Sequence, residues 1–360
     1  MENEAGHFDD LVEALQDPLG VRSLCFEGDE WVREDLVLSE AVGSLENLEV
    51  LEIEAYGEVR LPESLRELKK LRKLSLDCGL REVPWVVWEM EGLEELELML
   101  TRWELPGDLR WLKRLRSLDV QGVTRLCPEI GYLKRMERLN VYATGMRSLP
   151  VEIQNLTGLK GLDISYGAFP NLPKFVCRMS HLEYLNISYT FIDELPLEIA
   201  NLKGLRTLEF GKQREHHDKE KYKSRVLQIR QAWCELRELR KLDLSGQRIL
   251  DCSANVRNWT QLEELDLSYN EMDAIPGELF QLGSLRKVDL NFNRVQEIPE
   301  KIGNWERVEE LSLNGNPIEA LPEGIGKMKR LRYLDLRNTR VSEIVVEGIR
   351  ERFPRAKVER

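Results

Sequence analysis

The chain has 360 residues, of which 42% are apolar and 32% charged. This is ordinary globular usage, so the chain can bury a large core and does not have a disordered composition. Its 52 basic and 64 acidic residues give a net charge of -12, and such a surface repels phosphate backbones and anionic lipid. We therefore do not expect nucleic acid or a membrane surface to be the partner.

Neither end of the chain nor its apolar stretches indicate targeting to a membrane. The most apolar stretch, 83–88, is interrupted by Pro84 and is far shorter than the ~20 residues of a spanning helix. The acidic N-terminus lacks both the basic start and the apolar run of a secretory signal. We expect a cytoplasmic protein without a cleavable signal peptide or a transmembrane segment.

The first elements in chain order predict a cap. Apolar residues between Phe8 and Leu15 recur at helical spacing and predict a short helix. Val21, Leu24 and Phe26 then indicate a divergent strand that leads into the pattern that follows.

From Leu48 onward one pattern repeats. Leu-x-x-Leu-x-Leu, with other apolar residues allowed at the leucine places, occurs thirteen times at intervals of 21 to 23 residues, apart from one of 34. A fixed period of this size marks a stacked-repeat protein. The alternation predicts one short strand per repeat with one face inward, which a single repeat cannot bury alone. The first residues of the repeats are Leu48, Leu71, Leu93, Leu115, Met136, Leu159, Leu182, Leu205, Leu239, Leu262, Leu285, Val308 and Leu331.

Proline occupies one place in the middle of the repeat. An apolar residue followed by proline occurs in eight repeats, from Leu61-Pro62 to Leu321-Pro322. With Pro128 and Pro173, ten of the 14 prolines fall there. Proline has no backbone N–H and a fixed φ, so it ends the strand and sets the turn into the returning segment.

These residues resemble the leucine-rich repeat family from about Leu48 to Arg340. The 23-residue unit with Leu-Pro and a following Ile-Gly, as at Ile130-Gly131, is similar to the intracellular, Ras-associated subclass. The resemblance implies an α/β fold, a curved horseshoe-like solenoid with a parallel sheet on its concave face and short helical or irregular segments on its convex face. It implies little about function.

Asparagine closes the strand segment in this family, where its amide bonds to the backbone of adjacent turns. Here it stands at that place only as Asn270, Asn293 and Asn316. In the N-terminal half threonine, glycine or valine replaces it. We therefore expect that half to be less regular, with its backbone groups satisfied in other ways.

The 34-residue interval contains an insertion at about 213–223 that follows directly on a strand. Insertions in repeat arrays map to loops on one face, often the binding face. The alternative is a solvated decoration, because charge-rich segments without apolar residues rarely fold alone. His216-His217-Asp218 lacks a preformed geometry, so we predict no metal site there.

The chain ends with a second predicted cap. A helix is expected from Val345 to Phe353 and a short strand at Ala356, Lys357 and Val358. We predict three parts: an N-terminal cap and divergent first repeat (1–47), thirteen repeats (48–340) and a C-terminal cap (341–360). With both caps, and no linker between them, we expect a complete, monomeric protein.

The fifth residue of each repeat is predicted to face solvent on the concave side, and nine of 13 are acidic. Aspartate is frequent there in the family, so this column has a structural interpretation. The alternative is a partner with a basic surface, because stacked like charges destabilise one another. The column reads Glu52, Ser75, Glu97, Asp119, Asn140, Asp163, Asn186, Glu209, Asp243, Asp266, Asp289, Ser312 and Asp335.

Aromatic residues accompany the acidic column: Tyr142, Tyr166, Tyr184, Tyr189, Tyr269, Phe292 and Tyr333. Either these rings pack on one another along the sheet, or they are interaction hot spots in an acidic groove. The predicted partner-binding residues are Tyr142, Asp163, Tyr166, Tyr184, Asn186, Tyr189, Glu209, Asp243, Asp266 and Tyr269.

Other residues favour structural roles. Six dispersed cysteines without a Cys-x-x-Cys pair indicate reduced, structural thiols. The convex-side tryptophans, Trp85, Trp88, Trp111, Trp233, Trp259 and Trp305, are expected mostly in the core. Val86 and Val87 beside Trp85 and Trp88 suggest an apolar patch as a secondary contact.

No catalytic motif was found among phosphate loops, nucleophile elbows, zinc-protease helices or kinase signatures. Two carboxylates of the acidic column lie at a glycosidase-like spacing, but an open, solvated ladder would not drive their pKa values apart. We predict no enzyme and no cofactor. The expected function is a protein-interaction scaffold that binds a protein partner on its concave face. The alternative is a sensor or effector that inhibits or redirects a partner enzyme.

Overall fold

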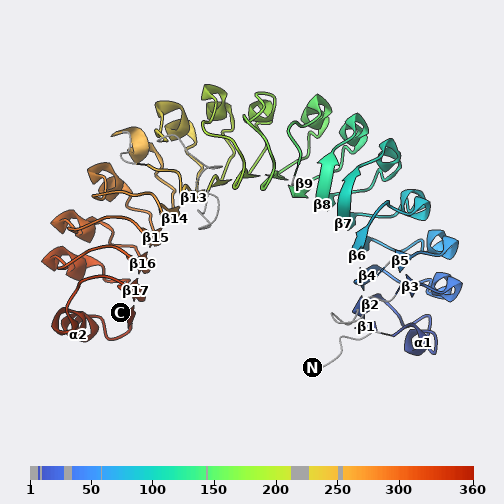
Figure 1. Ribbon diagram of the computed structural model, residues 1–360, viewed down its shortest axis with the longest axis horizontal. Coiled ribbons are helices and arrows are strands. Elements are labelled where there is room, and N and C mark those ends of the chain that lie inside the picture. Colours follow the sequence, from blue (N-terminus) through green and yellow to red (C-terminus); the bar gives the residue numbers. More distant parts are fainter. Residues whose placement is uncertain are drawn as a thin grey trace. The chain divides into compact units, whose positions relative to one another are not determined.

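The structure is a computed structural model that describes residues 7–8, 10–27, 35–57, 59–142, 145–211, 227–249 and 254–360. The chain divides into two compact units, Met1–Ala168 and Phe169–Arg360. Within each unit, short strands alternate with short 3-10 helices along the chain. The strands line one side of the unit and the helices the other (Figure 1).

The first unit contains a parallel sheet built from one strand of each successive repeat. Its strands β6, β7 and β8 are long, with eight, ten and nine residues. A separate parallel pair joins β3 (Leu36–Val37) to β5 (Val59–Arg60). The main strands, each paired with the next, are β1 (His7–Phe8), β2 (Ser23–Glu27), β4 (Val50–Glu54), β6 (Lys73–Leu80), β7 (Glu95–Glu104), β8 (Ser117–Arg125), β9 (Arg138–Tyr142) and β10 (Gly161–Asp163).

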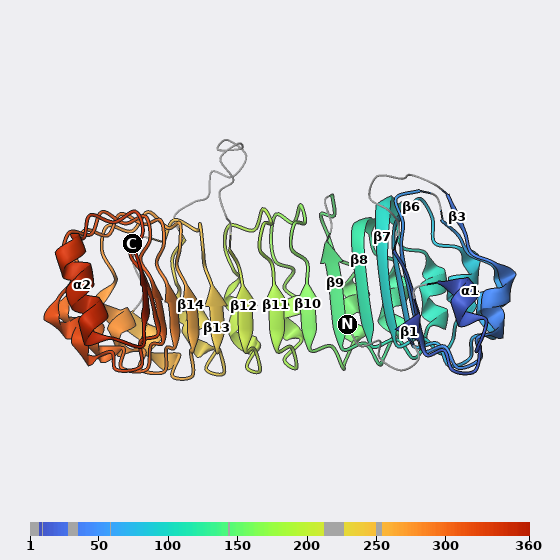
Figure 2. The same cartoon turned by 90° about the horizontal axis from the view of Figure 1, so that it is seen from below.

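The second unit repeats the arrangement with strands of three residues that follow one another in register. Figure 2 shows β11 to β14 running side by side. The strands, all parallel, are β11 (Tyr184–Asn186), β12 (Thr207–Glu209), β13 (Lys241–Asp243), β14 (Glu264–Asp266), β15 (Lys287–Asp289), β16 (Glu310–Ser312), β17 (Tyr333–Asp335) and β18 (Lys357–Glu359).

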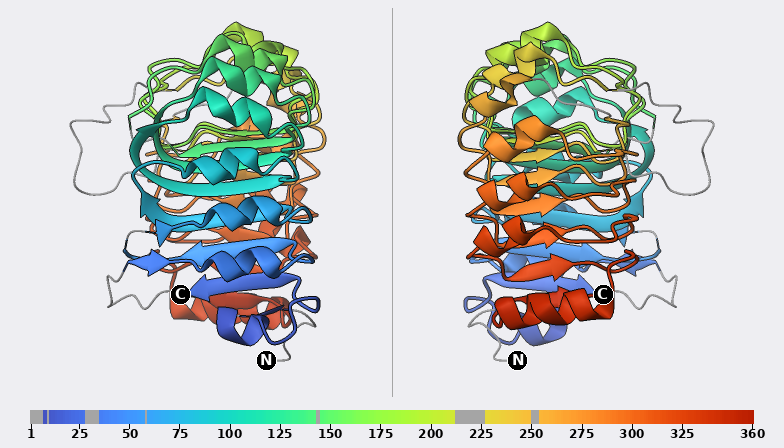
Figure 3. Two further views of the ribbon diagram at one scale, coloured as in Figure 1. Left: turned by 90° about the vertical axis from the view of Figure 1, so that its right-hand side faces the viewer. Right: turned by 90° about the vertical axis from the view of Figure 1, so that its left-hand side faces the viewer.

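The returning segments form 3-10 helices, and one α-helix lies near each end of the chain (Figure 3). In the first unit these are α1 (Leu11–Ala14), η1 (Glu40–Ser44), η2 (Glu63–Glu67), η3 (Trp85–Glu89), η4 (Gly107–Trp111), η5 (Pro128–Tyr132) and η6 (Val151–Asn155). In the second they are η7 (Val176–Arg178), η8 (Leu197–Asn201), η9 (Gln231–Glu235), η10 (Ala254–Asn258), η11 (Gly277–Gln281), η12 (Glu300–Asn304), η13 (Glu323–Lys327) and α2 (Glu343–Arg352).

The predicted period places these elements. A strand lies at each of the thirteen predicted repeats, from β4 to β17, and the leucines of the pattern are buried, as Leu242, Leu265 and Leu311 illustrate. Proline directly precedes η2, η3, η4, η6, η8, η11, η12 and η13, where its extended backbone ends the strand segment as predicted. The expected end elements also occur as α1, β2, α2 and β18.

Buried amides tie the repeats of the second unit together. Asn293 donates from Nδ2 to the Leu267 carbonyl at 2.9 Å, and its Oδ1 accepts from the backbone N–H of Asn270 and of Met272 at 3.2 and 3.0 Å. Asn270 and Asn316 make equivalent bonds, as predicted. Gln247, which the sequence reasoning missed, takes the same place one repeat earlier and donates to the Phe210 carbonyl.

In the first unit the strands themselves replace these amides. β6, β7 and β8 continue through Gly79, Thr101 and Val123, the places where asparagine is lacking. Their pairing contains register shifts, between Leu76 and Leu80 for example. The expected irregularity of this half is confirmed, and extended pairing is what satisfies its backbone.

The predicted tryptophan core is correct for four residues and wrong for two. Trp88, Trp233, Trp259 and Trp305 are buried, but Trp85 is 60% exposed and Trp111 47% exposed. The third residue of each five-residue helix points inward, whereas the first residue, as Trp85, and the last, as Trp111, point outward. The expected apolar patch is also wrong, because Val86 and Val87 are buried.

Five of the six cysteines lie in the described residues, and all five are free thiols, as predicted. Burial raises the pKa of Cys78 and of Cys177 to about 12, and of Cys127 and of Cys234 to about 11. A thiol with such a pKa stays protonated and is a poor nucleophile, which fits a structural role. Cys252 and the predicted insertion at 213–223 lie outside the described residues.

A ladder of alternating charge runs along the start of the strands. It consists of the second residue of each repeat: Glu49, Arg72, Glu94, Arg116, Glu137, Lys160, Glu183, Arg206, Arg240, Glu263, Arg286, Glu309 and Arg332. In the described residues Arg116 lies 4.0 Å from Glu94 and 2.5 Å from Glu137, and Arg286 lies 4.0 Å from Glu263 and 3.0 Å from Glu309. In the sequence, only the step from Arg206 to Arg240 joins two like charges.

Candidate partner-binding surface

The exposed face of the strands in the second unit carries the predicted acidic column. Register places Asp243 beside Asp266 and Asp266 beside Asp289 on β13, β14 and β15. Adjacent parallel strands lie about 4.8 Å apart, so these carboxylates are close neighbours. The sequence-predicted Asp243 and Asp266 are therefore brought together, with Asp289 as a third member.

The acidic column has a structural task in addition to any binding role. In each of these aspartates Oδ1 accepts a 2.8 Å hydrogen bond from the backbone N–H two residues later, at Ser245, Ser268 and Asn291. Asn186 forms the same turn with Ser188 at 2.9 Å. The side chain thus fixes the turn that ends each strand, which supports the structural interpretation of the column.

Burial, aided by neighbouring carboxylates, raises the pKa of two of these aspartates. Burial raises the pKa of Asp289 to about 6, against the hydrogen bond from Asn291, and the charge of Asp266 adds to the rise. Burial and the charge of Asp266 also raise the pKa of Asp243. A cation placed beside these carboxylates would favour their ionised form.

Lysines in the neighbouring third column offset part of this charge. Lys241 Nζ lies 2.7 Å from Glu209 Oε1, and Lys287 Nζ lies 3.1 Å from Glu310 Oε2. Burial opposes protonation of Lys241, but the hydrogen bond and charge of Glu209 outweigh it and raise its pKa. Sequence reasoning missed these lysines, although their places beside the acidic column were readable from the repeat.

Three strands are joined by one polar network that includes two predicted site residues. Tyr184 on β11 donates its hydroxyl to Glu209 Oε2 on β12 at 3.2 Å, and Lys241 on β13 holds the other oxygen of Glu209. The structure therefore brings Tyr184 and Glu209 together. Because Glu209 is already paired on both sides, Tyr184 contributes its ring rather than a free hydroxyl to the surface.

Aromatic residues follow the strands in an unusual backbone conformation. Tyr166, Tyr189, Tyr269 and Phe292 have φ of 56°, 57°, 58° and 53°. Left-handed backbone is rare for bulky residues and costs about 1 to 2 kcal/mol each. Residues in the same place of other repeats are Gly246, Gly315 and Asn338, which adopt it more easily.

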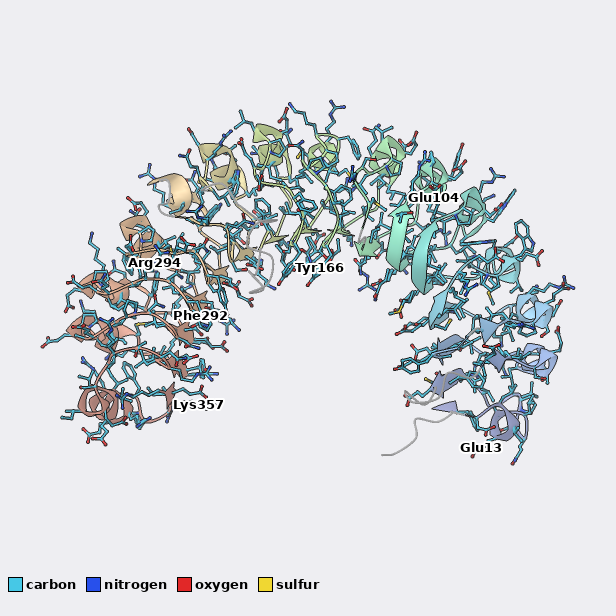
Figure 4. The ribbon with its side chains drawn as sticks, viewed as in Figure 1. Glu13, Glu104, Tyr166, Phe292, Arg294 and Lys357 are labelled. Carbon is cyan, nitrogen blue, oxygen red and sulfur yellow. The ribbon has the colours of Figure 1, made fainter. Side chains whose placement is uncertain are left out.

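Two of these rings form a platform. Tyr269 and Phe292 stack with ring centroids 4.5 Å apart and an interplanar angle of 21°. Phe292 lies over Gly315, where a Cβ would come within 2.7 Å of its Cδ1, so that glycine makes room for the ring. Phe292 is nevertheless 42% exposed, and it lies on the strand side of the second unit (Figure 4).

Three predicted site residues belong to the first unit. Tyr166 is 53% exposed on the strand side (Figure 4). Asp163 is only 4% exposed and accepts from the Ser165 backbone N–H at 2.8 Å, so the expectation that it faces solvent is wrong. Tyr142 ends β9.

Other kinds of site find no support in the described residues. No three His, Cys, Asp or Glu side chains there are grouped closely enough to hold a metal ion. Within the same residues, no helix combines the length and apolarity needed to cross a membrane. His216 and His217 lie outside the described residues.

Comparison with known proteins identifies the family. A family model described as a leucine-rich repeat region matches residues 170–302, and a leucine rich repeat model matches 283–341. No curated protein matches the chain. The chain is a leucine-rich repeat protein, and its fold is the leucine-rich-repeat solenoid predicted from the sequence. The Ras-associated subclass stays a prediction.

Solved structures of similar fold come from several sources. A leucine-rich repeat protein of Leptospira interrogans is 26% identical, with 98% of this chain and 99% of that chain covered and a TM-score of 0.63. An internalin of Listeria monocytogenes is 16% identical over 96% and 88%, with a TM-score of 0.62. A plant peptide hormone receptor, RGFR1, in complex with RGF2 is 23% identical over 93% and 58%, with a TM-score of 0.58. The fold supports a protein-interaction scaffold in general.

Proposed function

We propose that this chain is a non-enzymatic scaffold that binds a protein partner with a basic surface through the exposed faces of its strands. The observation that carries the proposal is the stacked pair Tyr269 and Phe292 in left-handed backbone, of which Phe292 is exposed and Tyr269 half-buried. The sequence-predicted residues other than the buried Asp163 remain the proposed contact set, to which Phe292 is added.

The aromatic pair supports binding because its position is costly without a partner. Glycine or asparagine satisfies the same backbone elsewhere in the unit, so packing does not require an aromatic ring there. Aromatic rings bury a large area with few rotatable bonds and are enriched among interface hot spots. The pair therefore fits a protein contact better than a purely structural role.

The charges beside the pair indicate the chemistry of the partner. Glu264 on β14 is exposed between Lys241 and Lys287 on the flanking strands. Burial raises the pKa of Tyr269, and the charges of Asp289 and Asp266, which reach this side chain, add to the rise. A lysine or arginine of a partner would meet both carboxylates and ring faces there. Its affinity should fall as salt concentration rises.

The test is affinity capture with quantitative mass spectrometry, using the wild type, Tyr269→Ala/Phe292→Ala and a matched control, Trp85→Ala/Tyr132→Ala. The control removes two exposed rings from the helix side. Circular dichroism and urea unfolding check that each variant folds. A protein retained by the wild type and the control, but lost by the Tyr269/Phe292 variant, is the partner predicted.

Calorimetric titration with that purified partner then measures how much affinity the Tyr269/Phe292 variant loses. Removal of two hot-spot rings should weaken binding at least about 30-fold, which corresponds to about 2 kcal/mol. Retention of every partner by the folded Tyr269/Phe292 variant would show that the platform is not the binding surface.

A further inference from the structure

A second surface of the second unit has a different chemistry. A hollow of 480 Å³ lies where the chain enters the strands β14 to β17, at the edge that carries the charge ladder. Arginines from different repeats line it: Arg240, Arg286, Arg307 and Arg330. The remaining lining residues are Glu263 and three neutral polar side chains, Ser284 among them. Its lining has no apolar residue.

The lining carries excess positive charge. Four arginines against one glutamate give a local formal charge of +3, in a chain whose net charge is -12. At physiological ionic strength charges more than about 8 Å away are largely screened, so the lining and Glu309, which pairs with Arg286, determine the potential in the hollow, and their sum is still positive. The acidity of the whole chain therefore does not keep anions away from it.

Two of the four arginines have no carboxylate partner among the described residues. Arg286 is held by Glu263 and Glu309, and Arg240 lies 3.4 Å from Glu263. Arg307 and Arg330 are exposed and make no ion pair or side-chain hydrogen bond with the residues that the structure describes. Their guanidinium groups are available to a ligand.

The charge ladder gives a second reason for excess positive charge at Arg240. Arg240 follows Arg206 at the like-charged step, and its backbone N–H donates to the Arg206 carbonyl at 2.7 Å. Arg206 turns to Glu183 at 3.1 Å and Arg240 turns to Glu263, away from each other. Arg286 has a glutamate on each side, Glu263 and Glu309. Arg240 has only Glu263, which it shares with Arg286.

The arginine side chains, the small volume of the hollow and its polar lining indicate the kind of ligand that would fit. A guanidinium binds an oxyanion through two parallel N–H bonds, and a phosphate group carries about 1.5 to 2 negative charges at neutral pH. We propose that this hollow binds a compact anion that carries two or more phosphate groups. Two phosphate groups can balance the +3 charge of the lining within 480 Å³, whereas a ligand with carboxylate groups needs three of them.

The site is independent of the proposed protein contact. Its residues are the second residue of a repeat or lie just before the repeat begins, whereas Tyr269 and Phe292 follow the strands at their opposite end. Binding of the phosphate ligand should therefore persist in the Tyr269→Ala/Phe292→Ala variant. Failure of one proposal leaves the other standing.

Calorimetric titration of the full chain tests the assignment in buffer free of divalent cations. The probes are sodium tripolyphosphate, orthophosphate and citrate, and the variants are Arg307→Gln/Arg330→Gln and the control Arg178→Gln/Arg257→Gln. Arg178 and Arg257 are exposed and lie outside the hollow, so both variants remove the same charge. All four positions are exposed, and urea unfolding verifies that stability is unchanged.

We expect one tripolyphosphate per chain, bound at least tenfold more tightly than orthophosphate or citrate. Arg307→Gln/Arg330→Gln should weaken it at least tenfold, and the control should leave it unchanged. Three outcomes overturn the proposal: no binding to the wild type, equal weakening in the control variant, or citrate affinity equal to that of tripolyphosphate, which would assign the hollow to polycarboxylates.

Discussion

At the scale of single residues, the acidic column shows how one side chain can serve two purposes. Its prevalence was predicted from the sequence, but its hydrogen bonds to the following turn were not, because they depend on the turn geometry at the strand end. Asp163 makes the same bond, to Ser165, but is buried. The lysines that offset the charge, such as Lys241, required knowledge of which neighbour each side chain reaches.

Asp289 should make stability depend on pH. Its pKa is raised to about 6 in the folded chain, above the roughly 3.9 of an unfolded aspartate, so its ionised form costs stability above pH 6. That cost is relieved as pH falls from about 6 to about 4. Asp289→Asn keeps an oxygen for the Asn291 N–H but loses the 3.2 Å bond that Oδ2 accepts from Asn291 Nδ2. It should therefore stabilise the protein at pH 7 by only about 1 kcal/mol after allowance for partial exposure.

Urea unfolding at pH 7 and pH 4.5 measures this effect, with Asp273→Asn as the control because Asp273 is exposed. The advantage of Asp289→Asn should shrink at the lower pH, whereas the control should stay within about 0.5 kcal/mol of the wild type. An advantage that is equal at both pH values would contradict the explanation.

At the scale of elements, the repeat pattern predicted the strands because a period of about 23 residues constrains every turn of the chain at once. The resemblance to the leucine-rich repeat family, rather than the period itself, implied the buried asparagines. It did not predict the long strands β6 to β8, since their extension depends on pairing with neighbours. Trp85 and Trp111 were misassigned because apolarity alone does not show which side of a 3-10 turn faces inward.

Asn293 should be among the costliest side chains to remove. Asn293→Ala leaves the buried N–H groups of Asn270 and Met272, and the Leu267 carbonyl, without their partner. A buried unsatisfied group costs about 1 to 3 kcal/mol, so we expect a loss of about 3 kcal/mol in the free energy of unfolding. Asn304→Ala, at an exposed site, is the control for urea unfolding and should cost less than about 0.5 kcal/mol. Equal losses would refute a structural role for the ladder.

At the scale of the whole molecule, each repeat pairs with the repeats beside it, so stability is expected to be local. The sequence predicted this stacked organisation. It could not predict the division into two compact units at Ala168, because no linker or change in composition marks that point.

Hydrogen exchange should reveal this locality. In Asn293→Ala, amides of β14 and β15 should lose protection, because their repeats share its hydrogen bonds. Amides of β4, β6 and β7 should exchange as in the wild type. Mass spectrometry of peptides from both units measures the difference, and a uniform loss across the chain would show that it unfolds as one cooperative body.

The alternating ladder also constrains how this array could have grown. The charge of the ladder changes sign from each repeat to the next. Duplication or loss of two repeats therefore keeps opposite charges on neighbouring repeats, whereas duplication or loss of one repeat places two like charges on neighbouring repeats. The Arg206 to Arg240 junction has that mismatch, and it coincides with the interval of 34 residues. A single repeat added or lost beside this junction would restore the alternation of charge along the whole array.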